Sequence, residues 1–199
     1  MNLDVRLKIV SDKKQLESII DYCGAMRIVF FRELPYCYAG SFEQEKEYLS
    51  IYIREKLSIV VVAELGSDII GIATGIPFFT LAHYFGDIQK QYETFNIDIN
   101  KVFYIGELIV KPEHRGKGLA SKLLSLIYSF AQEHGFTKIS VCTGVQPIEN
   151  VHSQSIEKLL NKEGWIDQNL VSISEFPTVQ IDGSIASENH QLKFWIRDI

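Results

Sequence analysis

The sequence predicts a mixed α/β domain in which one sheet carries helices on both of its faces. Its 199 residues suit a single domain spanning 1–199. An early hairpin of two β-branched runs is followed by a strand–helix–strand unit. The element order is β, α, α, β, β, β, α, β, α, β, β. This order predicts a central mixed, mostly antiparallel sheet of six to seven strands.

The chain opens with a short strand and two capped helices. Residues 6–10 alternate as a strand. Asp12 to Gln15 has the pattern of a capping box, and the apolar positions after it recur at helical spacing. Pro35 ends any continuation of this helix. A second capping box, Ser41 to Gln44, predicts that another helix begins there.

The middle of the chain is rich in strands. Ile59 to Leu65 and Ile69 to Ile76 are apolar runs separated by a short turn, which predicts an antiparallel hairpin. Phe78 to Lys101 is an aromatic stretch of weak pattern, for which we expect partial helix. Val102 to Val110 predicts a long buried strand.

The second half alternates helices and strands. The clearest helix runs from Gly116 to His134, with leucines and other apolar residues at spacings of three and four. Lys138 to Thr143 predicts a strand, and Ser153 to Glu163 another helix. Trp165 to Phe176 and Leu192 to Arg197 are expected as terminal strands joined by a polar loop.

Composition excludes several classes of protein. With 20 Lys and Arg against 25 Asp and Glu, the net charge is −5, which argues against nucleic-acid binding through a cationic face. Mean hydropathy is +0.04, and no apolar run approaches the ~20 residues of a membrane span. The N-terminus lacks a secretory pattern. Three cysteines without Cys-x-x-Cys spacing predict neither a disulfide framework nor a metal site. We therefore expect a cytoplasmic protein with reduced thiols.

The segment from Val110 to Ala120 carries the most chemical information, because it joins a buried strand to an apolar helix. The first turn of a helix has backbone N–H groups without intrahelical partners. Gly116 and Gly118 expose those groups, and Arg115 and Lys117 add positive charge. The pattern predicts a phosphate site. It is neither a Walker A loop nor a dinucleotide fingerprint. A glycine turn without a ligand is the alternative.

These residues resemble the signature of the GNAT superfamily of acyl-CoA-dependent N-acetyltransferases, which is Arg or Gln, two residues, Gly, one residue, then Gly or Ala. The matching run is Arg115-Gly116-Lys117-Gly118-Leu119-Ala120. The preceding residues 108–113 are also similar to the family's strand and its exit, and the element order fits the fold along nearly the whole chain. Arg32 to Gly40 further resembles a segment of an uncharacterised bacterial subgroup of the family.

The resemblance implies a GNAT-like fold with a splayed central strand pair and acetyl-CoA (coenzyme A) as the cofactor. The backbone of the exposed strand would pair with the pantetheine amides, and an amide at Leu108 or a neighbour would polarise the thioester carbonyl. Ser153 lies near a position where members present a polar residue to the cofactor. The expected cofactor-binding residues are Leu108, Ile109, Val110, Arg115, Gly116, Lys117, Gly118, Leu119, Ala120, Ser121 and Ser153.

Glu107 is the candidate general base for an amine acceptor. Strict alternation places it with Phe103, Ile105 and Ile109 on one face of an apolar strand. Burial is expected to raise the pKa of its carboxyl toward a useful range. Gly106 beside it suggests a bulge that redirects the side chain into the slot. The alternative is a glutamate paired with an arginine in the core.

The group that reprotonates the leaving thiol is less well marked. Many family members have a tyrosine four residues before the glycine that ends the later helix, and this chain has Leu160 there. Tyr104, His152 and Cys142 are substitutes by position. His152 has a helix cap or a surface residue as its alternative, and Cys142 an inert core thiol. Solvent is a further proton source.

The fold implies an acceptor pocket between two aromatic segments, Phe31 to Gly40 and Phe78 to Lys101. Glu33 and Asp87 would attract a cationic amine. The alternative is that these aromatic residues fill the core beneath long loops. The expected substrate-binding residues are Phe31, Glu33, Tyr36 and Tyr38.

The predicted function is acetyl transfer from acetyl-CoA to a primary amine, directly within a ternary complex, because the sequence offers no activated nucleophile. The acceptor would be a small molecule or a peptide. We expect no nucleic-acid, membrane or metal partner, and a homodimer is left open. The alternative function is a non-catalytic acyl-CoA-binding sensor or interaction module.

Overall fold

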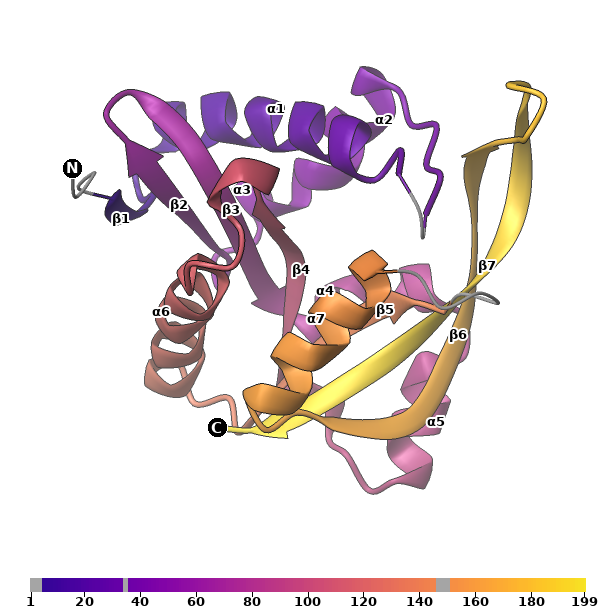
Figure 1. The fold of residues 1–199 in the computed structure, drawn as a ribbon. Coiled ribbons are helices and arrows are strands. Elements are labelled where there is room, and N and C mark those ends of the chain that lie inside the picture. The colour runs from indigo at the N-terminus through magenta and orange to yellow at the C-terminus, as the bar shows by residue number, and fades with distance from the viewer. Residues whose placement is uncertain (1–4, 34–35, 146–150) are drawn as a thin grey trace.

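Seven strands form one sheet in the computed structural model, which describes residues 5–33, 36–145 and 151–199. The strand order is β1-β2-β3-β4-β5-β7-β6, and only the β4–β5 pair is parallel within these ranges. The predicted mixed, mostly antiparallel sheet is therefore confirmed (Figure 1). The strands are β1 (Val5–Ile9), β2 (Ile59–Leu65), β3 (Asp68–Pro77), β4 (Val102–Val110), β5 (Lys138–Gly144), β6 (Ile166–Val179) and β7 (Ile185–Asp198).

The helices begin close to their predicted caps. Asp12 accepts a hydrogen bond from the Gln15 amide at 2.9 Å, and Ser41 and Gln44 form the predicted capping box. Within the described ranges, every helix is too short or too polar to span a bilayer. The α-helices are α1 (Lys13–Phe30), α2 (Phe42–Leu49), α3 (Ile51–Arg54), α4 (Phe78–Leu81), α5 (Ile88–Thr94), α6 (Leu119–Glu133) and α7 (Val151–Lys162), and short 3₁₀ turns cover Ala82–Phe85, Ile99–Lys101 and Pro112–His114.

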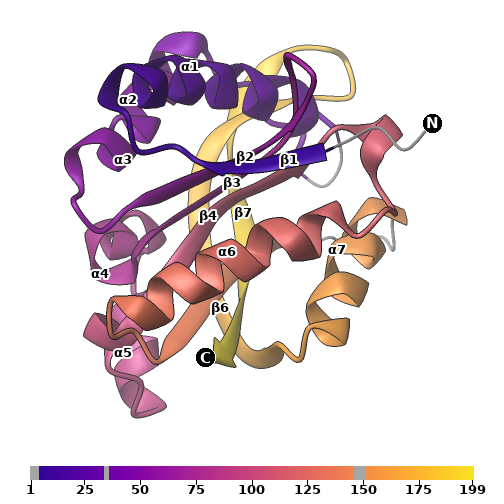
Figure 2. The same cartoon turned by 90° about the vertical axis from the view of Figure 1, so that its left-hand side faces the viewer.

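The first four strands separate two helical layers. Figure 2 shows α1 and α2 on one face of these strands and α6 on the other. Ile20 and Cys23 of α1 belong to one apolar cluster, and Leu123 and Ile127 of α6 belong to the second. Each helix therefore buries its apolar stripe against its own face of the sheet.

The aromatic stretch after β3 packs as core. The ring of Phe78 lies 5.9 Å from that of Phe85, 5.0 Å from Tyr92 and 5.2 Å from Tyr104. Phe194 of β7 completes this cluster. For Phe78, Phe85 and Tyr92 the structure therefore contains the alternative of core packing, whereas Phe79, Tyr84 and Phe95 are about half exposed.

The terminal hairpin is longer than the sequence analysis expected. Strands β6 and β7 have 14 residues each, so the segment taken as a polar loop is mostly paired strand. Its outer half is largely solvent-exposed and lacks the apolar alternation that predicts a strand. The α1–α2 connection pairs with this outer half: the Ala39 amide donates to the Pro177 carbonyl and the Val179 amide to that of Cys37, each at 2.8 Å.

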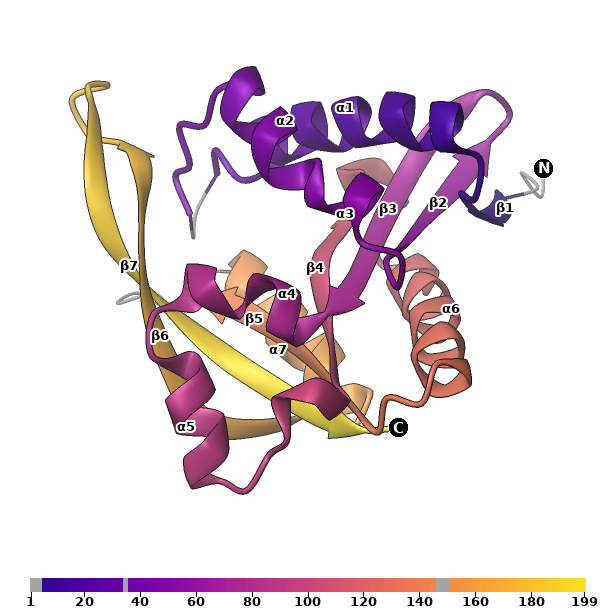
Figure 3. The same cartoon turned by 180° about the vertical axis from the view of Figure 1, so that it is seen from behind.

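Strands β4 and β5 pair only at their beginnings. Their register runs from Val102 and Lys138 to Ile105 and Val141, and Figure 3 shows the two strands diverging beyond it. The predicted splay is therefore present. The splay begins directly after Ile105, which is also where the pairing of β4 with β3 becomes irregular.

That irregularity is the bulge suggested by Gly106. Gly106 and Glu107 together face the single residue Thr74 of β3. The extra residue reverses the faces that follow it, so the strict alternation assumed from the sequence is wrong beyond Ile105. As a result Glu107 shares the α1 face of the sheet with Tyr104.

Candidate active site

A slot of about 490 Å³ lies where β4 and β5 diverge. Its walls come from the bulge and end of β4, the end of β5, the start of α6, one side of α7 and the segment after α1. The slot is lined by Gly106, Leu108, Ile109 and Val110 from β4; by Cys142, Thr143 and Gly144 from β5; by Arg115, Gly116, Gly118, Leu119, Ala120 and Ser121 from the loop and α6; and by Phe31, Glu33 and Tyr36 from the segment after α1.

The start of α6 is open to this slot. Gly116 and Gly118 have φ angles of 72° and 76°, in the left-handed region that favours glycine. No side chain caps the helix, and its first regular bond runs from the Lys122 amide to the Gly118 carbonyl. The amides of the first turn are thus available to an anion. The helix begins at Leu119 rather than at the predicted Gly116.

The basic residues of the loop differ in their positions. Arg115 lines the slot and is held by a 2.9 Å hydrogen bond from its Nε to the Val110 carbonyl. Lys117 is exposed, and its Nζ donates to the Glu113 carbonyl at 2.8 Å. The Lys117 side chain does not line the slot, because it turns back over the preceding 3₁₀ turn. A contact of Lys117 with the cofactor stays a prediction for its backbone amide.

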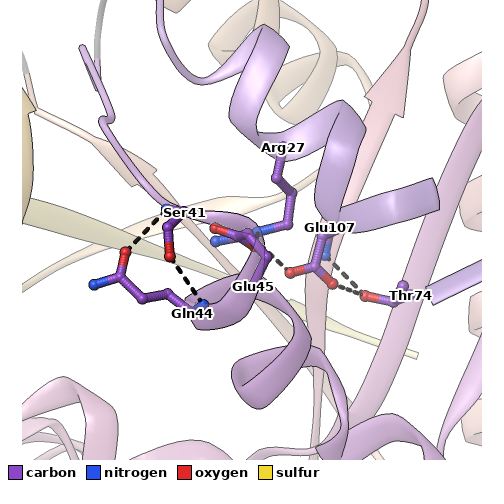
Figure 4. Close-up of polar contacts among 6 residues, drawn as sticks. All are labelled: Arg27, Ser41, Gln44, Glu45, Thr74 and Glu107. Atoms are coloured by element: carbon purple, nitrogen blue, oxygen red, sulfur yellow. Dashed lines mark hydrogen bonds and ion pairs between the residues drawn. The ribbon is translucent and has the colours of Figure 1, made fainter. Parts of the chain in front are cut away.

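Glu107 is part of a buried polar cluster, shown in Figure 4. Its Oε1 accepts a 2.8 Å hydrogen bond from Arg27 Nη1, and its Oε2 accepts one from the Thr74 hydroxyl. The Glu107 amide in turn donates to the same hydroxyl oxygen at 3.0 Å. The Glu107 side chain has 0% exposure and does not line the slot. The structure therefore contains the buried Glu–Arg pair that was the alternative to a base in the slot.

Arg27 joins this pair to α2. Its Nε lies 2.5 Å from Glu45 Oε2, and its guanidinium stacks on the rings of Phe31 and Tyr48 at 5.0 and 4.9 Å. Burial alone would lower the pKa of Arg27, but the Glu107 carboxylate and its neighbours raise it well above the ordinary value. One guanidinium thus faces two carboxylates.

Tyr52 of α3 packs against the back of the bulge. A Cβ on Gly106 would lie 1.8 Å from the Tyr52 hydroxyl oxygen, so only glycine fits there. This hydroxyl is buried and has no hydrogen-bond partner among the described residues. Glu45 Oε1 is likewise buried and has no partner among them.

Tyr104 and Cys142 form a contact at the base of the splay. The Tyr104 hydroxyl lies 2.9 Å from Cys142 Sγ, and Tyr104 is only 2% exposed. Of the two, Cys142 lines the slot and Tyr104 does not. Burial raises the pKa of Cys142 to about 11 and that of Tyr104 well above its ordinary value. Cys142 is therefore a half-buried wall residue rather than a core thiol, and it stays protonated at neutral pH.

The residues expected to bind the acceptor divide into two groups. Phe31, Glu33 and Tyr36 line the slot. Tyr38 does not: its ring edge packs on Phe176 at 5.7 Å, and its backbone bridges to Thr178. The bridge turns Tyr38 toward the outer hairpin, which the sequence analysis had not recognised as strand.

Other candidates lie outside the slot or outside the described residues. The carboxylate of Asp87 accepts a 2.9 Å hydrogen bond from Gln91 Nε2 and is not part of the slot. Helix α7 contains the backbone of His152 and Ser153, whose side chains lie outside the described part of the chain.

The partners of Glu107 were not predicted from the sequence. Arg27 follows Cys23 by four residues and so interrupts the apolar face of α1 with a charge, which is a signal for a buried counter-ion. Glu45, Thr74 and Tyr52 carried no comparable signal, because their contacts depend on the packing of three separate elements.

An open helix start beside a free strand edge defines the class of the site: it suits a ligand with a pyrophosphate at one end and amides along its length. Comparison with known families agrees. The sequence model of the Acetyltransferase (GNAT) family matches residues 27–155. The chain belongs to the GNAT acetyltransferase family, and it is an acyltransferase.

Solved structures share the fold at low sequence identity. The IAA acetyltransferase from Bacillus cereus ATCC 14579 has a TM-score of 0.58 at 16% identity, with 98% of this chain and 100% of that chain covered. An N-acetyltransferase from Staphylococcus aureus Mu50 has a TM-score of 0.60 at 15% identity, with 98% of each covered.

A third structure, yncA from Salmonella typhimurium with its cofactor acetyl-CoA, has a TM-score of 0.55 at 18% identity and covers 98% of this chain and 93% of that one. No curated protein matches the sequence.

Proposed function

We propose that this protein transfers the acetyl group of acetyl-CoA to the primary amine of a small-molecule or peptide acceptor, directly within a ternary complex. The observation that carries the proposal is the continuity of one slot from the glycine loop of α6, along the free edge of β4, to the aromatic segment after α1. Both reactants can then meet at the bulge without an intermediate on the enzyme.

The residues of the slot fit the cofactor in three parts. The amides from Gly116 to Ser121, with Arg115, would bind the pyrophosphate. The backbone of Leu108 to Val110 would bind the pantetheine amides. The Leu108 amide would donate to the thioester oxygen. The bound cofactor supplies an activated acyl carbon, and these backbone groups hold that carbon beside the bulge.

Glu107 is the proposed final acceptor of the amine proton, which it receives indirectly. Because its side chain is buried behind Gly106, the proton reaches it through an intervening water rather than from the amine itself. Its bonds to Arg27 and Thr74 fix both carboxylate oxygens. Deprotonation of the amine is thereby tied to the polar cluster beneath the slot.

Phe31, Glu33 and Tyr36 are the proposed acceptor wall. Glu33 is exposed at this end of the slot, where its carboxylate attracts a cationic amine. Phe31 is backed by Arg27, which keeps the ring in place.

The test is release of free thiol from acetyl-CoA in the presence of a panel of primary amines, with mass spectrometry of each acceptor. Thiol release that depends on one of the amines, with an acceptor gain of one acetyl group, supports the proposal. Tight binding of acetyl-CoA without amine-dependent release contradicts it and favours the non-catalytic sensor.

A further inference from the structure

The Tyr36 hydroxyl lies inside the opening between the splayed strands. It accepts a 3.2 Å hydrogen bond from the Gly144 amide of β5, and Tyr36 itself lines the slot. The next amide, that of Val145, donates to the Gln191 carbonyl of β7 at 2.8 Å. Successive amides of a strand point in opposite directions, so the Gly144 amide points away from β7 and into the slot. Tyr36 therefore reaches across the slot to its β5 wall.

This contact lies beyond the paired part of β4 and β5. The last paired residues of the two strands are Ile105 and Val141, and Gly144 follows Val141 by three residues. Because of the bulge, Leu108 lies two β3 positions beyond Ile105. The Tyr36 hydroxyl therefore lies on the β5 wall of the same slot that the β4 backbone lines from Leu108 onward.

The Tyr36 hydroxyl is also fixed in its orientation. Its oxygen accepts from an amide, so its own proton remains to be donated. The ring packs against Phe31 at a centroid distance of 5.1 Å. The Tyr36 and Cys37 amides both donate to the Glu33 carbonyl, at 3.2 and 3.1 Å, and hold the turn that carries the ring.

Two other hydroxyl or thiol groups at this end of the slot are less available. Cys142 Sγ contacts the Tyr104 hydroxyl. Thr143 Oγ1 accepts a 3.0 Å hydrogen bond from Trp195 Nε1, and Thr143 is buried, with 5% exposure, whereas Tyr36 is half-buried. Tyr36 is therefore the described residue best placed to donate a hydrogen bond to a ligand between β4 and β5.

We propose that the Tyr36 hydroxyl donates a hydrogen bond to the sulfur of coenzyme A and stabilises it as the departing thiolate. This assignment rests on the proposed function and goes beyond the acceptor-binding role expected from the sequence. It makes Tyr36 a catalytic residue that acts on the leaving group.

The step balances without proton transfer from Tyr36. The amine nitrogen bonds to the acyl carbon, the carbon–sulfur bond breaks, and its electron pair moves to sulfur. The amine proton goes toward Glu107, and the thiolate takes a proton from water after release. Burial raises the pKa of Tyr36 to about 12, above the roughly 8.5 of an ordinary thiol. The hydroxyl therefore keeps its proton and acts as a hydrogen-bond donor.

The experiment compares the binding of coenzyme A with that of S-methyl-coenzyme A, which has no ionisable thiol, by calorimetry from pH 6 to pH 10. For the wild-type protein, coenzyme A should gain roughly 10- to 100-fold in affinity over the methylated probe as the pH rises, since a hydrogen bond to a charged group has that strength. Tyr36→Phe should abolish the gain, and Tyr128→Phe, which removes a hydroxyl of α6 outside the slot lining, should keep it.

A second measurement separates this role from acceptor binding. With an active amine, Tyr36→Phe should lower kcat about 100-fold and leave the KM of the amine unchanged. A raised KM with unchanged kcat would overturn the assignment. So would equal pH dependence of the two probes with the wild-type protein, a result that does not require the variant to fold. Loss of amine-dependent turnover in the wild-type protein would instead overturn the proposed function, and the binding comparison still decides the role of Tyr36.

Discussion

Arg27 Nη1 lies 2.8 Å from Glu107 Oε1, although 80 positions separate the two residues in the chain. The pair joins α1 to the bulge of β4, and Glu45 extends it to α2. Three elements that share no local sequence signal are thus held together beneath the slot by one guanidinium.

The first prediction concerns stability. Arg27→Met leaves Glu45 and Glu107 buried without a cation, and we expect a loss of about 3–5 kcal/mol in the free energy of unfolding. Unfolding in guanidinium chloride measures this free energy. The control is Arg32→Met at an exposed position, which should change stability by less than about 0.5 kcal/mol. Equal losses in the two variants would show that the cluster contributes nothing.

The second prediction concerns proton removal. Glu107→Gln keeps the shape of the side chain but removes the charge, so kcat should fall about 100-fold. The affinity for coenzyme A should stay within about threefold, because the side chain does not line the slot. Steady-state kinetics and calorimetry measure the two quantities, with the exposed Glu133→Gln as the control. Unchanged turnover would remove Glu107 from the mechanism.

The third prediction concerns the bulge. Gly106→Ala forces a methyl group against the Tyr52 hydroxyl, at a cost of about 1–3 kcal/mol in the free energy of unfolding. Adding Tyr52→Phe should restore most of that stability, since the hydroxyl has no partner among the described residues to lose. A double-mutant cycle by urea unfolding measures the coupling. Strict additivity would contradict the contact.

The fourth prediction concerns the helix start. Gly118→Ala puts a side chain at a φ of 76°, and we expect coenzyme A affinity to fall at least about tenfold as the loop amides turn away. Gly66→Ala is the matched control, because Gly66 has a φ of 63° in the β2–β3 turn and, like Gly118, open space around it. Both variants should lose similar stability, and only the first should lose affinity.

The fifth prediction concerns thiol reactivity. Because burial raises the pKa of Cys142 to about 11, its thiolate fraction at pH 8 is roughly 200-fold below that of an ordinary cysteine with a pKa of about 8.5. Alkylation by iodoacetamide should be slower by about that factor than alkylation of glutathione, although Cys142 lines the slot. Site-resolved mass spectrometry measures the rate, and rapid labelling would contradict the prediction.

Apolar patterns in the sequence predicted the helices and strands well where one face of the element, or the whole element, is buried. The bounds of β4 are those expected, because eight of its nine residues are apolar or small and the run separates two loops. The length of β6 and β7 was underestimated, since the outer hairpin is paired by backbone bonds rather than by an apolar face. The open start of α6 follows from Gly116 and Gly118, as predicted, although the helix begins at Leu119. The Lys117 side chain turns away from the slot through a rotamer that no sequence pattern encodes.

The polar cluster and Tyr36 show where sequence reasoning stops. A bulge was suggested by Gly106, but its effect on the faces of β4 depends on the register with β3. The Tyr36–Gly144 contact spans 108 positions and arises only when the segment after α1 folds over the splay. Such contacts follow from topology and have no periodic signature.

The position of β7 in the sheet has a consequence for biosynthesis. Strand β7 follows β5 and β6 in the sequence but lies between them in the sheet. A nascent polypeptide therefore cannot complete the sheet beside β5 until β7 has left the ribosome. Until then β5 has no neighbour on that side, and a prematurely terminated product would expose an unpaired strand edge prone to aggregation.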